Sequence, residues 1–320
     1  MAAVIDRVPP AASAKVRRIG FIGLGNMGAR MAQRLLAAGQ PMVVCDIVPD
    51  ILAAFAAEGS AVAEQPAEVS AAAEIVFLSL PTPQSVRAVC LGPSGVIEGN
   101  ATKIVVDLST TGPRVAKELA RHFADKGITF IDAPVSGGVV GAEAGTLSVM
   151  AAGDRQAFES IESLLRLLGR NVFYIGSVPG LGQSMKLVNN MLAATNALAA
   201  FETLVMGAKA GLDPQVMLDV INVSSGRNSA TLDKVPQCVL SRTFPLRFAT
   251  ELLYKDVRLC TEEAEEAGSL LWLGQTVKQI LAFAVAQGDG GKDYATIIQH
   301  FERWAGATVG AESAHPGTSR

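Results

Sequence analysis

Lys186 has the surroundings that a general acid and base requires. Its neighbours along the chain, Gly182, Met185, Leu187 and Val188, are small or apolar. Burial among such residues and the positive end of a helix both lower the pKa of a lysine from about 10.4 toward neutrality. A lysine of this kind can accept and return a proton near pH 7. The ordinary alternative is a surface lysine whose stem lies along apolar neighbours.

Polar groups that could hold a small ligand accompany this lysine. Asn190 lies four residues after it, on the same helix face, and Asn189 lies three residues after it. Ser136, Gly137 and Gly138 follow another apolar run, and their backbone N–H groups can form a nest for a carboxylate. A flexible glycine turn is the alternative for this second segment.

A glycine-rich segment near the N-terminus predicts a dinucleotide site. A GxGxxG pattern stands between an apolar run and an alanine-rich helical stretch. Its first glycine makes a tight turn, the second lets the backbone approach a pyrophosphate, and the third lets the helix pack on the strand. The alternative is that these glycines serve only a tight turn between strand and helix and bind no ligand. The predicted cofactor contacts here are Gly23, Leu24, Gly25, Asn26, Met27 and Gly28.

Further predicted cofactor contacts stand at the ends of later apolar runs. Asp46 comes 18 residues after Gly28, where a carboxylate can accept both hydroxyls of an adenosine ribose and repel a 2′-phosphate. The sequence therefore favours NAD over NADP. Leu80, Pro81 and Thr110 follow the next strands and can brace the same ligand. A fold that binds S-adenosylmethionine is an alternative, because it has a similar glycine-rich loop. Such a fold does not require the large helical region that follows in this chain.

The elements that position these residues predict an α/β fold with a second, all-α domain. From residue 18 to about 176, short β-branched runs alternate with helical stretches, which is typical of a Rossmann-type doubly wound, mostly parallel sheet covered on both faces. A long helix over about 183–210, with Lys186 in its first turn, then joins the domains. We expect a flexible leader at 1–16, an NAD-binding domain at 17–178, a helical domain at 179–305, and a flexible tail at 306–320.

Composition excludes several classes of function. The net charge of −3 argues against a nucleic-acid surface, and no run of about 18 uncharged apolar residues stands out as a membrane span. The 4 cysteines are far apart, so we expect neither a metal site nor a disulfide framework. We also expect a cytoplasmic location, because cytoplasmic proteins rarely carry disulfides. The 3 histidines are poorly placed to donate a proton to a carbonyl.

With these motifs in view, the chain resembles the β-hydroxyacid dehydrogenase family over about residues 18–304. The resemblance rests on GFIGLGNMG, DAPVSGG, GxGQxxKxxNN and the later Lys255-Asp256. It implies that Lys186 is the catalytic acid and base, that Asn190, with Asn189, orients the substrate hydroxyl, and that residues 136–138 hold the substrate carboxylate. It also implies that Lys255 lies beside the cofactor, and that the chain forms a homodimer or homotetramer.

The implied reaction is NAD-linked interconversion of a 3-hydroxy acid and its semialdehyde or 3-oxo acid. A substrate like 3-hydroxyisobutyrate is the first expectation, a diacid such as 2-hydroxymethylglutarate the second and tartronate semialdehyde the third. Arg247 precedes Phe248 where the family often has glycine, so Arg247 or Arg227 is a candidate for binding a second anionic group. A non-catalytic NAD-binding protein is the remote alternative.

Overall fold

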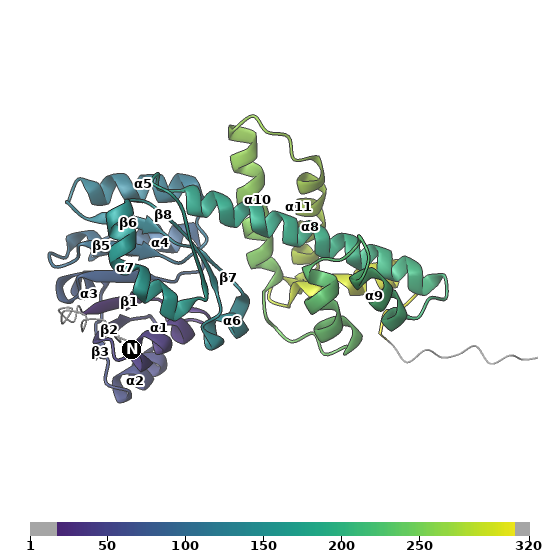
Figure 1. Cartoon of the computed structure of the whole chain (residues 1–320), viewed down its shortest axis with the longest axis horizontal. Helices are drawn as coiled ribbons and strands as arrows, with labels where there is room; N and C mark the ends of the chain where they lie inside the picture. The colour runs from purple at the N-terminus through teal and green to yellow at the C-terminus, as the bar shows by residue number, and fades with distance from the viewer. Residues whose placement is uncertain (1–17, 311–320) are drawn as a thin grey trace, which may run out of the picture.

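The computed structural model describes residues 18–310, which form a sheet domain and a helical domain joined by one long helix (Figure 1). The sheet runs in the order β3-β2-β1-β4-β5-β6-β8-β7, with β9 paired to β8. The strands are β1 (Ile19–Ile22), β2 (Met42–Cys45), β3 (Ala61–Val62), β4 (Ile75–Leu78), β5 (Ile104–Asp107), β6 (Thr129–Asp132), β7 (Val135–Ser136), β8 (Ser148–Ala152) and β9 (Asn171–Gly176).

The strand order determines where a ligand can bind. Strands β3, β2, β1, β4, β5 and β6 are all parallel, so their carboxyl ends share one edge of the sheet. The order reverses between β1 and β4, and such a switch point opens the crevice that binds dinucleotides in doubly wound folds. Strand β8 is antiparallel to β6 and β7. The predicted Rossmann-type, mostly parallel sheet is confirmed.

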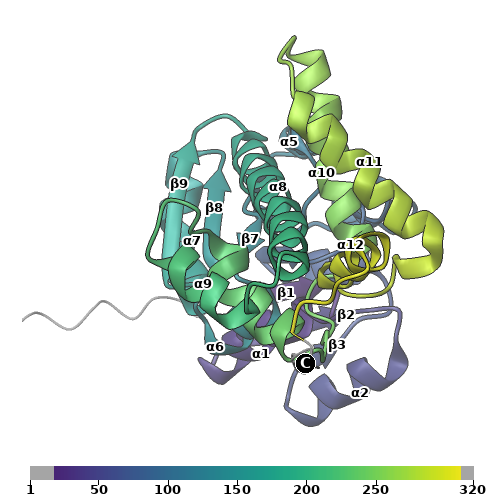
Figure 2. The ribbon, with the colours of Figure 1, turned by 90° about the vertical axis from the view of Figure 1, so that its right-hand side faces the viewer.

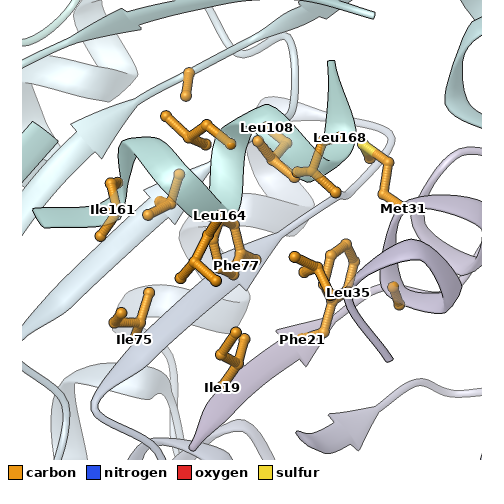
Figure 3. Close-up of a cluster of buried hydrophobic side chains, with 14 of the residues drawn as sticks. Ile19, Phe21, Met31, Leu35, Ile75, Phe77, Leu108, Ile161, Leu164 and Leu168 are labelled. Atoms are coloured by element: carbon orange, nitrogen blue, oxygen red, sulfur yellow. The ribbon is translucent and has the colours of Figure 1, made fainter. Parts of the chain in front are cut away.

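Helices cover both faces of the sheet. On one face, Met31 and Leu35 of α1 and Leu164 of α7 pack against Phe21 and Phe77 (Figure 3). On the other face, side chains of α3, α4 and α5 cover the same strands. The helical segments are α1 (Gly28–Ala37), α2 (Pro49–Ala57), α3 (Pro66–Ala72), α4 (Pro83–Leu91), η1 (Val96–Glu98), α5 (Pro113–Ala124), α6 (Gly138–Ala144) and α7 (Arg155–Leu168).

The helical domain is built around α8 (Leu181–Lys209), whose 29 residues measure about 43 Å. Figure 2 shows α8 beside α10, α11 and α12, which pack on it to form the second core. The other helices are α9 (Pro214–Asn222), η2 (Ala230–Leu240), α10 (Thr250–Glu266), α11 (Trp272–Ala284), η3 (Val285–Asp289), η4 (Tyr294–Ile297) and α12 (Ile298–Ala305).

The elements agree with the sequence prediction apart from three details. The long helix begins at Leu181 rather than 183, so Lys186 stands in its second turn. The two-residue strands β3 and β7 are too short to show a period, and they arise from pairing with β2 and β8. Strand β9 is not covered on both faces: Phe173 is 52% exposed because β9 pairs only with β8. The chain turns at Gly211, which has a φ of +89°, and Asp213 then caps α9.

Helix α8 is also long and apolar enough to cross a membrane by length and composition alone, which the sequence analysis did not single out. Half of its most apolar stretch is buried inside the protein. The apolar character of this stretch follows from its position, because a helix at the centre of a bundle packs against neighbours on several sides.

The two ends of the chain were predicted to be flexible. The predicted leader at 1–16 lies outside the described residues, as do residues 311–320 of the tail. Val309 lies within the predicted tail, yet it is fully buried, and its N–H donates to Glu302 Oε1 over 2.9 Å. The packed part of the helical domain therefore extends at least to Val309.

Candidate active site

The glycine-rich loop has the shape that a dinucleotide requires. Gly23 has a φ of +92°, and an added Cβ would meet the backbone of Ser79. A Cβ at Gly28 would meet the carbonyl of Gly23, so this glycine allows α1 to pack on β1. A Cβ at Gly25 has nothing within 4 Å, so the space beside the second glycine is open for a pyrophosphate. The three glycines thus fit the roles predicted for them.

Asp46, which follows β2, is hydrogen-bonded to this loop. Its carboxylate accepts hydrogen bonds from the N–H groups of Leu24 over 2.5 Å and Val48 over 2.9 Å. The Leu24 side chain is buried in the core, so Leu24 offers a ligand only its backbone. The next residue, Ile47, is 97% exposed and was not singled out from the sequence. An exposed isoleucine beside this acid offers an apolar surface to a flat ring such as adenine.

The loops after β4 and β5 are joined to one another and to the helical domain. The Leu80 N–H donates to Ser109 Oγ over 2.9 Å, and the neighbouring Pro81 is exposed. The carbonyl of Thr110 accepts a hydrogen bond from Lys255 Nζ over 2.7 Å. Lys255 belongs to α10, so this bond crosses between the domains. The predicted cofactor contacts Leu80, Thr110 and Lys255 are therefore neighbours.

The segment after β6 turns through two successive glycines. Gly137 and Gly138 both have positive φ, +130° and +64°. Both glycines are exposed, and a Cβ at Gly138 would meet nothing within 4 Å. Ser136 precedes them in β7 and is half-buried. This backbone leaves room for an anion beside the serine hydroxyl.

Lys186 is buried, with 7% of its surface exposed. Among residues 18–310 it makes no hydrogen bond or close ion pair. Its pKa is lowered to about 8, chiefly by burial; the carboxylate of Asp256 opposes this shift, and the nearby positive charge of Lys255 adds to it. A buried amine with this pKa exists in both protonation states near neutral pH, which general acid and base catalysis requires.

Asn190 and Asp256 connect the lysine's helix to α10. Asn190 Nδ2 donates to Asp256 Oδ2 over 2.6 Å, and both residues are buried. Asn189 is half-buried, and its amide donates to Asn190 Oδ1 over 3.1 Å. Lys255 Nζ stands 3.2 Å from Asp256 Oδ1. The structure therefore brings Asn189, Asn190 and Lys255 together, with Asp256 as the charge that joins them.

Two residues that sequence reasoning missed hold the start of α8. Gln183 is fully buried and bonds to the backbone of the loop after β5. Asp132, at the end of β6, accepts the N–H groups of Gly180 over 2.7 Å and Gln183 over 2.9 Å. Burial raises the pKa of Asp132 to about 6. The available signal was the position of Asp132 at a strand end, next to the predicted nest.

The arginines proposed to bind a second anion are not equally placed. Arg227 lies in the loop after α9, and Met217 of α9 lies beside Gly207 near the C-terminal end of α8. Arg247 is exposed just before α10, and its guanidinium donates to Gln237. Both arginines stay candidates for binding a second anionic group. No group of three or more histidine, cysteine or acidic side chains within 18–310 is arranged to hold a metal ion.

Comparison with known proteins identifies the family. The NAD binding domain of 6-phosphogluconate dehydrogenase matches residues 18–176, and the NAD-binding domain of NADP-dependent 3-hydroxyisobutyrate dehydrogenase matches residues 180–301. The chain belongs to the β-hydroxyacid dehydrogenase family. It is an oxidoreductase that acts on the CH–OH group of a hydroxy acid and uses NAD or NADP.

Named relatives span nearly the whole chain. A 2-(hydroxymethyl)glutarate dehydrogenase of Eubacterium barkeri is 38% identical over 91% of this chain and 97% of its own length. The mitochondrial 3-hydroxyisobutyrate dehydrogenase of Mus musculus is 36% identical over 88% and 86%. The solved 3-hydroxyisobutyrate dehydrogenase of Mycobacterium tuberculosis with L-serine has a TM-score of 0.81 and 31% identity, over 89% and 99%. These relatives bear out the expected fold and reaction class and leave the choice of substrate open.

Proposed function

We propose that this protein oxidises a 3-hydroxy acid reversibly to its semialdehyde or 3-oxo acid, with Lys186 as general acid and base. The observation that carries the proposal is a buried lysine without a hydrogen-bond partner among the described residues, one turn before Asn190. Neutral Lys186 takes the hydroxyl proton during oxidation and returns it during reduction. A dinucleotide bound at the glycine-rich loop would provide the hydride chemistry. Asn190, held by Asp256, orients the hydroxyl oxygen.

The carboxylate end of the substrate is assigned to residues 136–138. Ser136 supplies a hydroxyl, and Gly137 and Gly138 supply backbone N–H groups in a positive-φ turn. This turn follows β6, and Asp132 at the end of β6 also caps the helix that carries Lys186. The segment that would bind the substrate carboxylate is therefore linked through Asp132 to the start of α8, the helix that carries Lys186. Such a link would orient the bound substrate relative to the lysine.

We assign NAD as the preferred cofactor. The Asp46 carboxylate lies beside the glycine loop, where it can accept ribose hydroxyls in place of its bond from Leu24. A 2′-phosphate at the same place would meet a like charge. The described residues fit a dinucleotide because Gly25 opens onto free space and Ile47 is exposed beside the acid.

The substrate we rank first resembles 3-hydroxyisobutyrate, followed by a diacid such as 2-hydroxymethylglutarate and then tartronate semialdehyde. Arg247 is the first candidate for a second carboxylate, because its guanidinium is exposed and its hydrogen bond goes to the neutral Gln237; Arg227 is the alternative. Arg247→Ala tests this point. It should lower kcat/KM for diacids more than for monoacids, and an equal effect on both would remove Arg247 from the proposal.

The experiment that tests the function is reduction of NAD with a panel of 3-hydroxy acids, run beside Lys186→Ala. General acid and base catalysis contributes about 10²- to 10⁴-fold, so the variant should lose at least about 10²-fold in kcat. Lys209→Ala, at the far end of the same helix, is the matched control. Full activity of Lys186→Ala would refute the role of the lysine. Turnover of none of the panel would refute the substrate class.

We further propose a homodimer or homotetramer that buries apolar side chains of the helical domain. Met185, Val188 and Leu192 are exposed at 39%, 50% and 59% and share one stripe of α8. Val216 and Val220 add a similar stripe on α9, each at 58%. Light scattering of the purified protein should give a mass of two or four chains, and a monomer at micromolar concentration would contradict the proposal.

A further inference from the structure

The start of α8 is held by a cluster that we name the α8 anchor, which consists of Asp132, Gln183 and the backbone of residues 109–112. Gln183 Oε1 accepts the N–H groups of Thr111 over 2.9 Å and Gly112 over 3.2 Å, and Gln183 Nε2 donates to the Ser109 carbonyl over 2.9 Å. All three bonds are buried. A glutamine that uses both ends of its amide in this way fixes the distance and rotation of its helix relative to the loop.

Asp132 fixes the same turn from the other side. Its two carboxylate oxygens accept the Gly180 and Gln183 N–H groups, which are otherwise unpaired at a helix start. The helix also sits very close to the strands, since a Cβ at Gly182 would meet the Met150 carbonyl and Asp132 itself. These contacts therefore hold the first turn of α8 in a single position relative to the ends of β5 and β6.

The anchored turn lies immediately before the lysine. Lys186 follows Gln183 by three residues, so a continuous helix transmits the position of one to the other with a rise of about 4.5 Å. The loop bound by Gln183 is the one whose Thr110 carbonyl holds Lys255 and whose Ser109 hydroxyl holds the Leu80 N–H. The same backbone thus meets the predicted cofactor contacts and the helix of the proposed catalytic base.

We infer that Gln183 and Asp132 are positioning residues for Lys186: they set the place of its amine relative to the bound cofactor. This inference rests on the proposed function of Lys186. Neither side chain reaches the reacting atoms, because both are fully engaged with backbone groups. Misplacing a catalytic group by about 1 Å costs on the order of 10²-fold in rate, so the predicted effect is large and falls on the chemical step.

The test is a double-mutant cycle on the enzyme with its best 3-hydroxy acid. Gln183→Met keeps the length of the side chain and removes its hydrogen bonds. We expect kcat to fall about 10- to 10²-fold, with the Kd for NADH changed by less than about 2-fold. Added to Lys186→Ala, the same substitution should cause no further loss, because residues that act through one group are strongly non-additive. Asp132→Asn is the second variant, since it keeps one acceptor oxygen and removes the other.

Thr102→Val is the matched control for the loss of buried hydrogen bonds. Thr102 is buried, and its hydroxyl donates to the carbonyls of Ser70 and Ala73, away from the site. This control should lower stability without lowering kcat at 25 °C.

Three outcomes would overturn the inference: unchanged kcat in folded Gln183→Met and Asp132→Asn, losses that multiply with that of Lys186→Ala, or a weakened Kd for NADH as the main effect. Full activity of Lys186→Ala would instead refute the proposed function, and it is read independently in the same cycle. If Gln183→Met does not fold, Asp132→Asn alone decides between these outcomes.

Discussion

Asp256 Oδ2 accepts a hydrogen bond from Asn190 Nδ2 over 2.6 Å, and this bond ties α10 to α8 one turn beyond Lys186. Through it the helical domain supplies an anion beside the proposed base, while Lys255 supplies a cation next to the same carboxylate. The pKa of Lys186 is thus determined by burial and by the opposite charges of Asp256 and Lys255. This arrangement makes its protonation, and hence the reaction, dependent on pH.

The first prediction concerns that pH dependence. Oxidation needs neutral Lys186, whose pKa is lowered by burial to about 8. The kcat/KM for oxidation should therefore rise as pH increases toward about 8 and then level off, whereas reduction should fall above that pH because it needs the protonated amine. Initial rates in both directions from pH 6 to 10 check this. A flat profile in both directions would show that Lys186 does not carry the proton.

The second prediction separates the two charges beside the lysine. Asp256 raises the pKa of Lys186 and Lys255 lowers it. Asp256→Asn should therefore move the rising limb of the oxidation profile to lower pH, and Lys255→Met should move it to higher pH. Both variants also lose activity, so the position of the limb is measured rather than the rate. Shifts in the same direction would contradict the assignment.

The third prediction compares two glycines of one loop. A Cβ at Gly25 meets nothing within 4 Å, whereas a Cβ at Gly28 meets the Gly23 carbonyl. Gly25→Ala should keep the melting temperature and weaken NADH binding, because the methyl group enters the space assigned to the pyrophosphate. Gly28→Ala should instead lower the melting temperature. Calorimetry and fluorescence titration on both variants measure this, and the reverse pattern would refute the loop assignment.

The fourth prediction concerns the choice of cofactor. Asp46→Ser removes the carboxylate that faces the predicted ribose site and that accepts the Leu24 N–H. The ratio of kcat/KM for NAD to that for NADP should fall by about 10-fold or more, because the substitution removes the acceptor for the ribose hydroxyls and the like charge that repels a 2′-phosphate. Asp50→Ser, on the neighbouring helix α2, is the control and should keep the ratio. An unchanged ratio in Asp46→Ser would show that residues other than Asp46 determine the preference between NAD and NADP.

The fifth prediction concerns stability away from the site. Arg242 bonds to both carboxylate oxygens of Glu302, which is 6% exposed. Arg242→Ala leaves that buried charge uncompensated and should lower the free energy of unfolding by about 3 kcal/mol. Arg166→Ala removes an exposed pair with Glu162 and should cost about 0.5 kcal/mol or less. Urea unfolding of both variants checks the order, and similar losses would contradict it.

The sequence by itself determined the elements and most of the site. Apolar runs of four or five residues, GxGxxG and a long proline-free stretch are local patterns, so the parallel sheet and the long helix were readable without coordinates. The special φ of Gly23 and of residues 137–138 was readable for the same reason, because glycine at a strand end is a local signal.

Only the tertiary structure decided which distant groups meet at Lys186. The bonds of Gln183 to Thr111 and of Asn190 to Asp256 join residues 72 and 66 positions apart. No spacing in the sequence encodes such contacts, since they depend on how the start of α8 docks on two strand ends and how α10 packs across it. Burial of the lysine, and with it the pKa near 8, is likewise a product of packing rather than of neighbouring residue types.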